Sequence, residues 1–169
     1  FEQMKLKPTS RIVELGNTIG DELLKVHVSY GPLVQGLLRR FNSELETRNS
    51  KRETRNAKLE TQNAKLPLRA FAHITGGGFV DNIPRVLPKT CDVVIRKGSW
   101  EMLPIFRMIL ARGGVPEEEL YQVFNMGVGM TMVVAGEKAD AVLKFVRAQK
   151  CTAWLIGEVV KGRGEARVR

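Results

Sequence analysis

Residues 68–88 read LRAFAHITGGGFVDNIPRVLP, and the fold is decided in this stretch. Residues 69–74 have the composition of a β-strand, three consecutive glycines follow at 76–78, and a short helix is predicted through Ile83. A strand that turns through glycines into a helix presents backbone N–H groups at the positive end of that helix, where an anion binds favourably. The stretch therefore predicts an α/β element with a candidate phosphate cradle at the end of its strand.

Each polar residue around this turn is also compatible with an ordinary structural role. The glycines suit a tight turn that needs positive φ angles, and the run lacks the lysine of a Walker phosphate loop. His73 is compatible with a hydrogen-bond donor, a proton shuttle or a satisfied core histidine, and Arg85 with a phosphate ligand or a solvated side chain. Asn125 stands close to Gly127 and Gly129, where a helix-ending turn is the plain alternative. Taken singly, these residues leave the function open.

The chain after this stretch continues to alternate between strand and helix patterns. Apolar and polar residues alternate over 128–134 as in a strand, whereas 137–150 shows one apolar helical face. The further elements predicted are a strand at 92–95, helices at 104–111 and from 116 onwards, a strand at 153–160 and a short strand after Gly164. The fold class predicted is α/β (α+β), with a mixed β-sheet flanked by helices.

The chain before this stretch divides into two parts. Residues 1–44 are predicted to be helix and loop, with an amphipathic helix from Pro32 to about Phe41. Residues 45–66 are three tandem heptads, LETRNSK, RETRNAK and LETQNAK, followed by a leucine. The heptads have no second apolar position, so a flexible insertion is favoured over a dimerising helix. The domain organisation predicted is 1–44, an insertion at 45–66, and 67–169.

Composition limits the possible partners. The 169 residues carry 27 basic and 18 acidic side chains, a formal charge of +9 that favours anionic ligands. Aromatic residues make up 7% and are not interleaved with the basic runs, and no nucleic-acid-binding motif occurs. Two cysteines and two histidines without CxxC spacing predict no metal site, and reduced thiols are expected. Without an apolar run long enough to cross a bilayer, a cytoplasmic location and no membrane partner are predicted.

Several of these segments, read together, resemble one enzyme family. The run His73-Ile74-Thr75-Gly76-Gly77-Gly78-Phe79, followed by NIPRVLP at 82–88 and FNMGVGM at 124–130, is similar to the phosphoribosylformylglycinamidine cyclo-ligases, also called AIR synthetases. Trp100, the Pro-Ile-Phe at 104–106 and the segment 19–24 fit the same family. The resemblance covers nearly the whole chain except the heptads, and it is to the C-terminal half of that family.

The resemblance implies an ATP-dependent, C–N bond-forming cyclo-ligase of purine biosynthesis. Its substrate would be formylglycinamidine ribonucleotide, and its products aminoimidazole ribonucleotide, ADP and phosphate. His73 is given a catalytic role at the reacting amide. The residues assigned to phosphate or substrate binding are Thr75, Gly76, Gly77, Gly78, Asn82, Arg85 and Asn125. ATP and Mg²⁺ are the implied cofactors, with the metal ligands in the family's N-terminal half. That half is not found in these residues, and a homodimer or that missing half is the expected protein partner.

Two other interpretations use the same sequence differently. In the first, the chain is a basic interaction module whose heptads and 161–169 tail bind nucleic acid, which predicts an affinity that falls steeply with salt. In the second, the chain is a folded but inactive structural remnant without its N-terminal half. Nucleic acid is the less expected partner, because the basic runs lack aromatic stacking residues.

Overall fold

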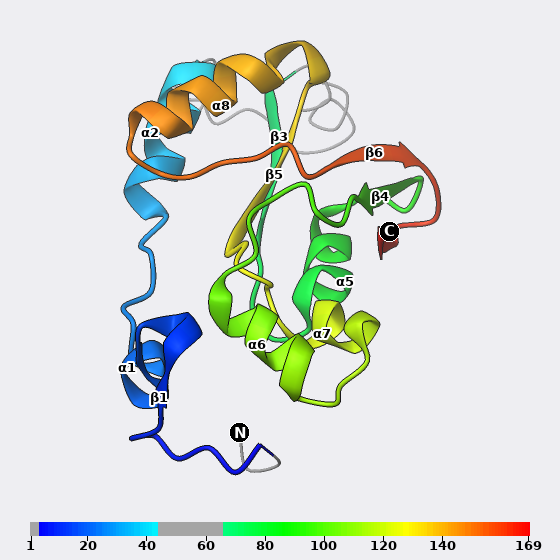
Figure 1. Ribbon diagram of the computed structural model, residues 1–169. Helices are drawn as coiled ribbons and strands as arrows, with labels where there is room; N and C mark the ends of the chain where they lie inside the picture. The colour runs from blue at the N-terminus through cyan, green and yellow to red at the C-terminus, as the bar shows by residue number, and fades with distance from the viewer. Residues whose placement is uncertain (1–3, 44–65) are drawn as a thin grey trace.

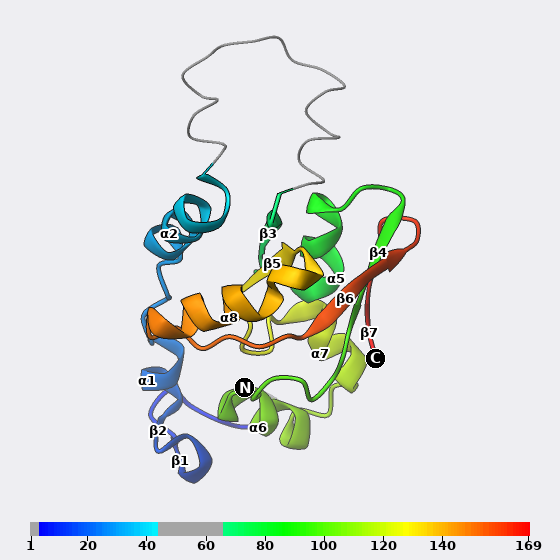
Figure 2. The ribbon, with the colours of Figure 1, turned by 90° about the horizontal axis from the view of Figure 1, so that it is seen from above.

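The computed structural model describes residues 4–43 and 66–169, so the heptad insertion, apart from its last leucine, lies outside the described residues. The described chain forms small sheets with helices packed around them (Figures 1 and 2). No helix in this part of the chain is both long and apolar enough to cross a membrane. Cys91 and Cys151 are free thiols.

The α-helices and strands alternate along the chain, with 3₁₀ turns (η) between some of them. In order they are β1 (Arg11–Ile12), η1 (Val13–Leu15), β2 (Asn17–Thr18), α1 (Ile19–Leu23), α2 (Gly31–Phe41), β3 (Leu68–His73), α5 (Gly78–Asn82), η3 (Ile83–Val86), β4 (Cys91–Ile95), α6 (Pro104–Arg112), α7 (Glu117–Val123), β5 (Met130–Val134), η4 (Gly136–Lys138), α8 (Ala139–Ala148), β6 (Gly157–Lys161) and β7 (Ala166–Val168).

Three sets of strands pair within the described residues. β4 is central in a mixed sheet of order β6-β4-β7, antiparallel to β6 and parallel to β7. β3 and β5 form a separate antiparallel pair, and β1 and β2, of two residues each, form a short antiparallel hairpin. The predicted α/β (α+β) class with a mixed sheet and flanking helices is therefore confirmed. The N-terminal region, which was expected to be helix and loop, also contains the short β1–β2 hairpin.

The predicted strand at 153–160 is wrong at its beginning, because β6 starts only at Gly157. The carbonyl oxygen of Ala153 accepts hydrogen bonds from the Arg147 side chain, at 3.2 Å from Nε and 2.8 Å from Nη2. A carbonyl held by a side chain of α8 is not available to a neighbouring strand. The alternation of apolar residues over 153–156 reflects burial against the core, since Trp154 and Ile156 are half-buried there.

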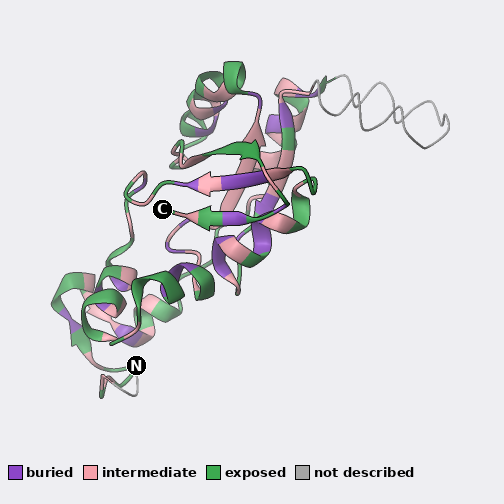
Figure 3. Cartoon of the chain, turned by 90° about the vertical axis from the view of Figure 1, so that its right-hand side faces the viewer, coloured by how far each residue is buried: buried purple, intermediate pink, exposed green. Residues whose placement is uncertain are grey.

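Buried apolar side chains of the described residues gather in three clusters (purple in Figure 3). The largest lies between the mixed sheet, α5 and α7, and it includes Phe79, Trp100 and Tyr121. A second joins α2 and α8 to β3 through Leu37 and Val146, and a third joins α6 to the N-terminal hairpin and α1. Edge-to-face contacts tie the largest cluster together, with Trp100 at 5.5 Å from Phe79 and 6.2 Å from Tyr121 between ring centroids.

Asn42, just after α2, connects the two chain segments that flank the insertion. Its side chain is buried, and its Nδ2 donates to the carbonyl of Leu68 at 2.8 Å while its Oδ1 accepts from the N–H of Leu68 at 3.1 Å. This pair of bonds continues the β3 backbone pattern with a side-chain amide. The end of α2 and the start of β3 are therefore held side by side.

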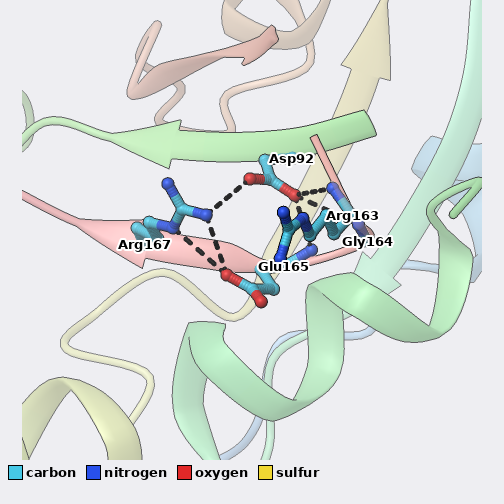
Figure 4. A network of polar contacts seen from close by, with 5 residues as sticks. All are labelled: Asp92, Arg163, Gly164, Glu165 and Arg167. Carbon is cyan, nitrogen blue, oxygen red and sulfur yellow. Dashed lines mark hydrogen bonds and ion pairs between the residues drawn. The ribbon is translucent and has the colours of Figure 1, made fainter. Parts of the chain in front are cut away.

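A buried carboxylate fixes the turn between β6 and β7 (Figure 4). The Oδ1 atom of Asp92 accepts from the backbone N–H groups of Arg163 at 2.7 Å, Gly164 at 3.1 Å and Glu165 at 2.9 Å. Its Oδ2 atom pairs with Arg167 at 2.8 Å. The N–H groups of Glu165 and Arg163, assisted by the Arg167 guanidinium, hold the pKa of Asp92 below its ordinary value despite burial.

This depressed pKa predicts an acid-dependent contribution to stability. The contribution is present above the ordinary aspartate pKa of about 3.9, and it is lost as the pH falls through the lower pKa of the folded state. We expect Asp92→Asn to lower the urea midpoint of unfolding at pH 7 and to make the midpoint less dependent on pH below 4. Urea titrations between pH 7 and 2.5 measure this. Asp140→Asn, at an exposed aspartate, should keep the original pH profile; an unchanged profile for Asp92→Asn would contradict the assignment.

Candidate functional site

The candidate site begins where β3 ends. In the β3–β5 pair His73 lies opposite Met130, and the N–H of Ile74 donates to the carbonyl of Gly129 at 2.9 Å. The His73 side chain is exposed, so it is not a core histidine. Its ring meets that of Tyr30 edge-on, with centroids 6.1 Å apart. The other possible roles of His73, donor or proton shuttle, are compatible with this exposure.

The glycine turn, residues 75–78, has the positive φ angles that the sequence analysis gave as the structural reason for its glycines. Gly77 has φ +92° and Gly78 has φ +54°, a region that side chains rarely adopt. The N–H of Gly78 closes the turn by donating to the carbonyl of Thr75 at 3.1 Å. By contrast, the N–H groups of Gly76 and Gly77 donate to no acceptor among the described residues, and Gly76 is exposed. Two adjacent backbone donors are thus available at the end of β3.

Gly78 is also the point of closest approach between α5 and α7. A Cβ atom at Gly78 would collide with the carbonyl oxygen of Tyr121 and lie 2.9 Å from that of Phe124. Gly78 is buried, so neither helix can move away without opening the main core. The third glycine of the run is therefore required by packing, and the first is not: a Cβ at Gly76 would meet nothing within 4 Å.

The side chain of Asn82 is buried beneath the turn. Its Nδ2 lies 2.8 Å from the carbonyl oxygen of Gly78, 3.2 Å from that of Gly76 and 3.4 Å from that of Thr75. The Thr75 hydroxyl donates to Asn82 Oδ1 at 3.4 Å. Asn82 thus holds the shape of the turn from within, and any contribution to phosphate binding is through the position of the glycine N–H groups.

Asn125 organises a second turn beside the first. Its Oδ1 accepts from the N–H of Gly127 at 3.0 Å, and its carbonyl accepts from the N–H of Val128 at 2.9 Å. Between them Met126 adopts φ +51°, and its carbonyl accepts from Trp100 Nε1 at 3.0 Å. Because Phe124 touches Gly78, this turn adjoins the glycine turn. The helix-ending turn that the sequence left open as the alternative is therefore present after α7, and Asn125 remains half-exposed.

Arg85, the last of the predicted residues, and Tyr30, which was not predicted, also lie near the site. Arg85 lies on η3, one turn after Asn82, and it is exposed without an ion pair to any described carboxylate. Tyr30, which the sequence reasoning missed, packs on His73, and its ring would lie 3.2 Å from a Cβ at Gly129. Burial raises the pKa of the Tyr30 hydroxyl. A glycine opposite a distant aromatic residue gave no recognisable signal in the sequence.

A cavity of about 630 Å³ lies beside the β5 strand. It is bounded by α2, α8, β5 and the segment 151–159, and mostly apolar side chains line it. Tyr30 and Gly129 stand at its border, whereas residues 75–78 do not line it. Within the described ranges no three His, Cys, Asp or Glu side chains gather as metal ligands would. The backbone N–H groups of Gly76 and Gly77 are the polar groups next to His73 that could hold an anion, and the cavity itself is lined by Arg69 and Arg96.

Comparison with known proteins shows which family the chain is similar to. A family model described as "AIR synthase related protein, C-terminal domain" matches residues 18–169. A phosphoribosylformylglycinamidine cyclo-ligase of Caldanaerobacter subterraneus subsp. tengcongensis is 46% identical over 167 residues, which are 97% of this chain and 41% of the relative. Cyclo-ligases of Geobacillus thermodenitrificans and Caldicellulosiruptor bescii are 38% and 39% identical, over 97% and 88% of this chain but 40% and 36% of their own lengths. The chain thus spans about two fifths of these relatives.

The contrast between Gly78 and Gly76 gives a prediction for stability. Gly78→Ala would force a methyl group into the Tyr121 carbonyl from a left-handed backbone, and we expect it to lower the free energy of unfolding by about 2–4 kcal/mol. Gly76→Ala has open space and should change that free energy by less than about 0.5 kcal/mol. Urea unfolding followed by circular dichroism measures both. Equal stabilities for the two variants would show that the α5–α7 contact is not a constraint.

Proposed function

This chain belongs to the AIR synthase related proteins and carries their C-terminal domain, and we propose that it is the C-terminal part of an ATP-dependent phosphoribosylformylglycinamidine cyclo-ligase. The relatives carry that name, and the chain covers about two fifths of their length. The observation that carries the proposal is the pair of unused N–H groups at Gly76 and Gly77 next to the exposed His73. Anionic groups of a nucleotide are the ligands that such a turn suits.

The chemistry to be supported is ring closure at an amide. An amide oxygen is a poor leaving group, so the γ-phosphoryl group of ATP is transferred to it, giving an activated imidate and ADP. A nitrogen of the same substrate then attacks the activated carbon, the C–O bond breaks, and phosphate departs. Such a reaction depends on positioning and on stabilising charge around the transferred phosphoryl group.

In the proposed site, some residues contact the ligand, and others hold these contacting residues in place. In this proposal the N–H groups of Gly76 and Gly77 bind a phosphate of the substrate or nucleotide, and His73 contacts the reacting amide as a polar partner. Thr75 and Asn82 keep the turn in shape through their mutual hydrogen bond. Gly78 allows the glycine turn to pack against the end of α7, and Asn125 shapes the turn that follows α7 through its hydrogen bond to Gly127.

Arg85 and the cofactors complete the proposal. Arg85 is free of described ion pairs and supplies a guanidinium for a second phosphate contact. ATP is the phosphoryl donor that the relatives' reaction requires. No carboxylate cluster that would bind Mg²⁺ occurs in the described part of the chain, so the proposal assigns its ligands to the N-terminal part of such enzymes. The proposed protein partners are that N-terminal part and a second subunit.

Binding of formylglycinamidine ribonucleotide and of Mg–ATP to the purified chain tests the phosphate site. We expect calorimetry to detect at least one of them, and Gly76→Glu to weaken that binding by about tenfold or more through repulsion of the phosphate. Gly136→Glu is the matched control, because it adds the same charge at another open glycine beyond the far end of β5. Absence of binding, or an equal loss in both variants, would refute a phosphate site at the glycine turn.

The role of His73 requires the complete reaction. In a polypeptide that joins the N-terminal part of the Caldanaerobacter relative to this chain, we expect His73→Ala to lower turnover by roughly 100- to 10,000-fold. The exposed position of His73 predicts little change in the unfolding midpoint. ADP release under saturating substrates measures turnover, and thermal unfolding provides the control. Unchanged turnover would remove His73 from the mechanism.

A further inference from the structure

An exposed apolar stripe runs along the segment between α1 and α2. Residues 24–29 read LKVHVS, so apolar and polar side chains alternate. Leu24, Val26 and Val28 are 83%, 94% and 61% exposed. Leu24 is the C-cap of α1, with φ −90° and ψ 4°, so the alternation that can bring side chains to one side begins after it, with Val26 and Val28. Neighbouring exposed apolar side chains of this kind are typical of a surface that another protein covers.

The backbone of this segment is unpaired as well. The N–H and C=O groups of residues 26–29 form no hydrogen bond with any described residue. In Figure 1 the chain between α1 and α2 runs alone along one side of the molecule. A backbone with free donors and acceptors, in a segment where apolar and polar residues alternate, can add as a strand to the edge of a sheet.

Both ends of the segment are fixed. At its start the N–H of Leu24 donates to the carbonyl of Gly20 at 3.0 Å, which joins the segment to α1, and a capping box of Thr18 and Asp21 stabilises the first turn of that helix. At its end Tyr30 packs on His73. A segment tethered at both ends has lost part of its conformational freedom before a partner arrives, which lowers the entropic cost of binding.

We infer that residues 24–29 are a docking strand that pairs with a sheet edge in the N-terminal part of a cyclo-ligase polypeptide. Two observations favour this occupant. The relatives contain about three fifths of additional length beyond the region this chain matches, and the matching family model is that of a C-terminal domain. The segment also leads through Tyr30 to His73, so a partner paired with it is brought to the candidate site.

This inference rests on the proposed function, because the partner is part of the same kind of enzyme, but its test does not use activity. The probe is the part of the Caldanaerobacter relative that precedes the matched region, used after a cooperative thermal transition shows that it is folded. We expect it to bind the chain, and we expect the amides of residues 25–29 to exchange with deuterium at least about tenfold more slowly in the complex.

Matched lysine substitutions locate the contact on the stripe. Val26→Lys should weaken binding of the probe by about tenfold or more. Val13→Lys introduces the same change at a valine that is 93% exposed on η1, outside the segment, and should leave the affinity within about threefold. Both positions are exposed, so both variants should keep the unfolding midpoint of the original chain.

Several results would overturn the inference. They are no binding of the folded probe, binding without protection of residues 25–29, or equal weakening by the two lysine variants. Protection of the same amides in the chain alone, together with a dimeric mass in light scattering, would show that a second copy is the occupant instead. If docking fails while formylglycinamidine ribonucleotide or Mg–ATP still binds, the proposed function stands and only the docking strand is rejected.

Discussion

The contact between Gly78 and the carbonyl oxygens of Tyr121 and Phe124 is the constraint on which the rest of the site depends. It brings α5 against the end of α7 with no room for a side chain. Phe79, the next residue, then enters the main core, where it meets Trp100 at 5.5 Å. The turn before them has a left-handed backbone at Gly77 and Gly78, which glycine adopts without the steric cost that a side chain would add. A glycine is required here for packing and conformation at once.

The polar residues of the site act mostly on the backbone. Asn82 and Asn125 each use their amide groups to shape a turn, and the two turns adjoin. What they leave at the surface is a pair of backbone N–H groups and the exposed ring of His73. Such preorganised backbone donors can stabilise charge without rearranging, which is the requirement of phosphoryl transfer. In the proposed phosphate site, mutating the asparagines would therefore act on binding through the geometry of the turns.

The N-terminal region is attached to the main body in two ways. α2 packs on α8, and Asn42 fastens its end to the start of β3 by two hydrogen bonds. The hairpin and α1 pack on α6 through a separate apolar cluster. Between these attachments residues 24–29 contribute no buried apolar side chain, and residues 26–29 form no backbone hydrogen bond with a described residue. This is the segment that we infer to be a docking strand.

The sequence by itself determined the local elements and the family. Periodicity placed α2, β3, β4, α6 and α8 to within a few residues, and the motif around 73–88 indicated the cyclo-ligases, because both signals lie in neighbouring residues. Only the tertiary structure decided that Asn82 points inward, that Tyr30 meets the His73 ring edge-on, and that residues 153–156 leave the strand. These features depend on which distant segments meet, and the pattern of one segment carries no record of the atoms that another brings against it.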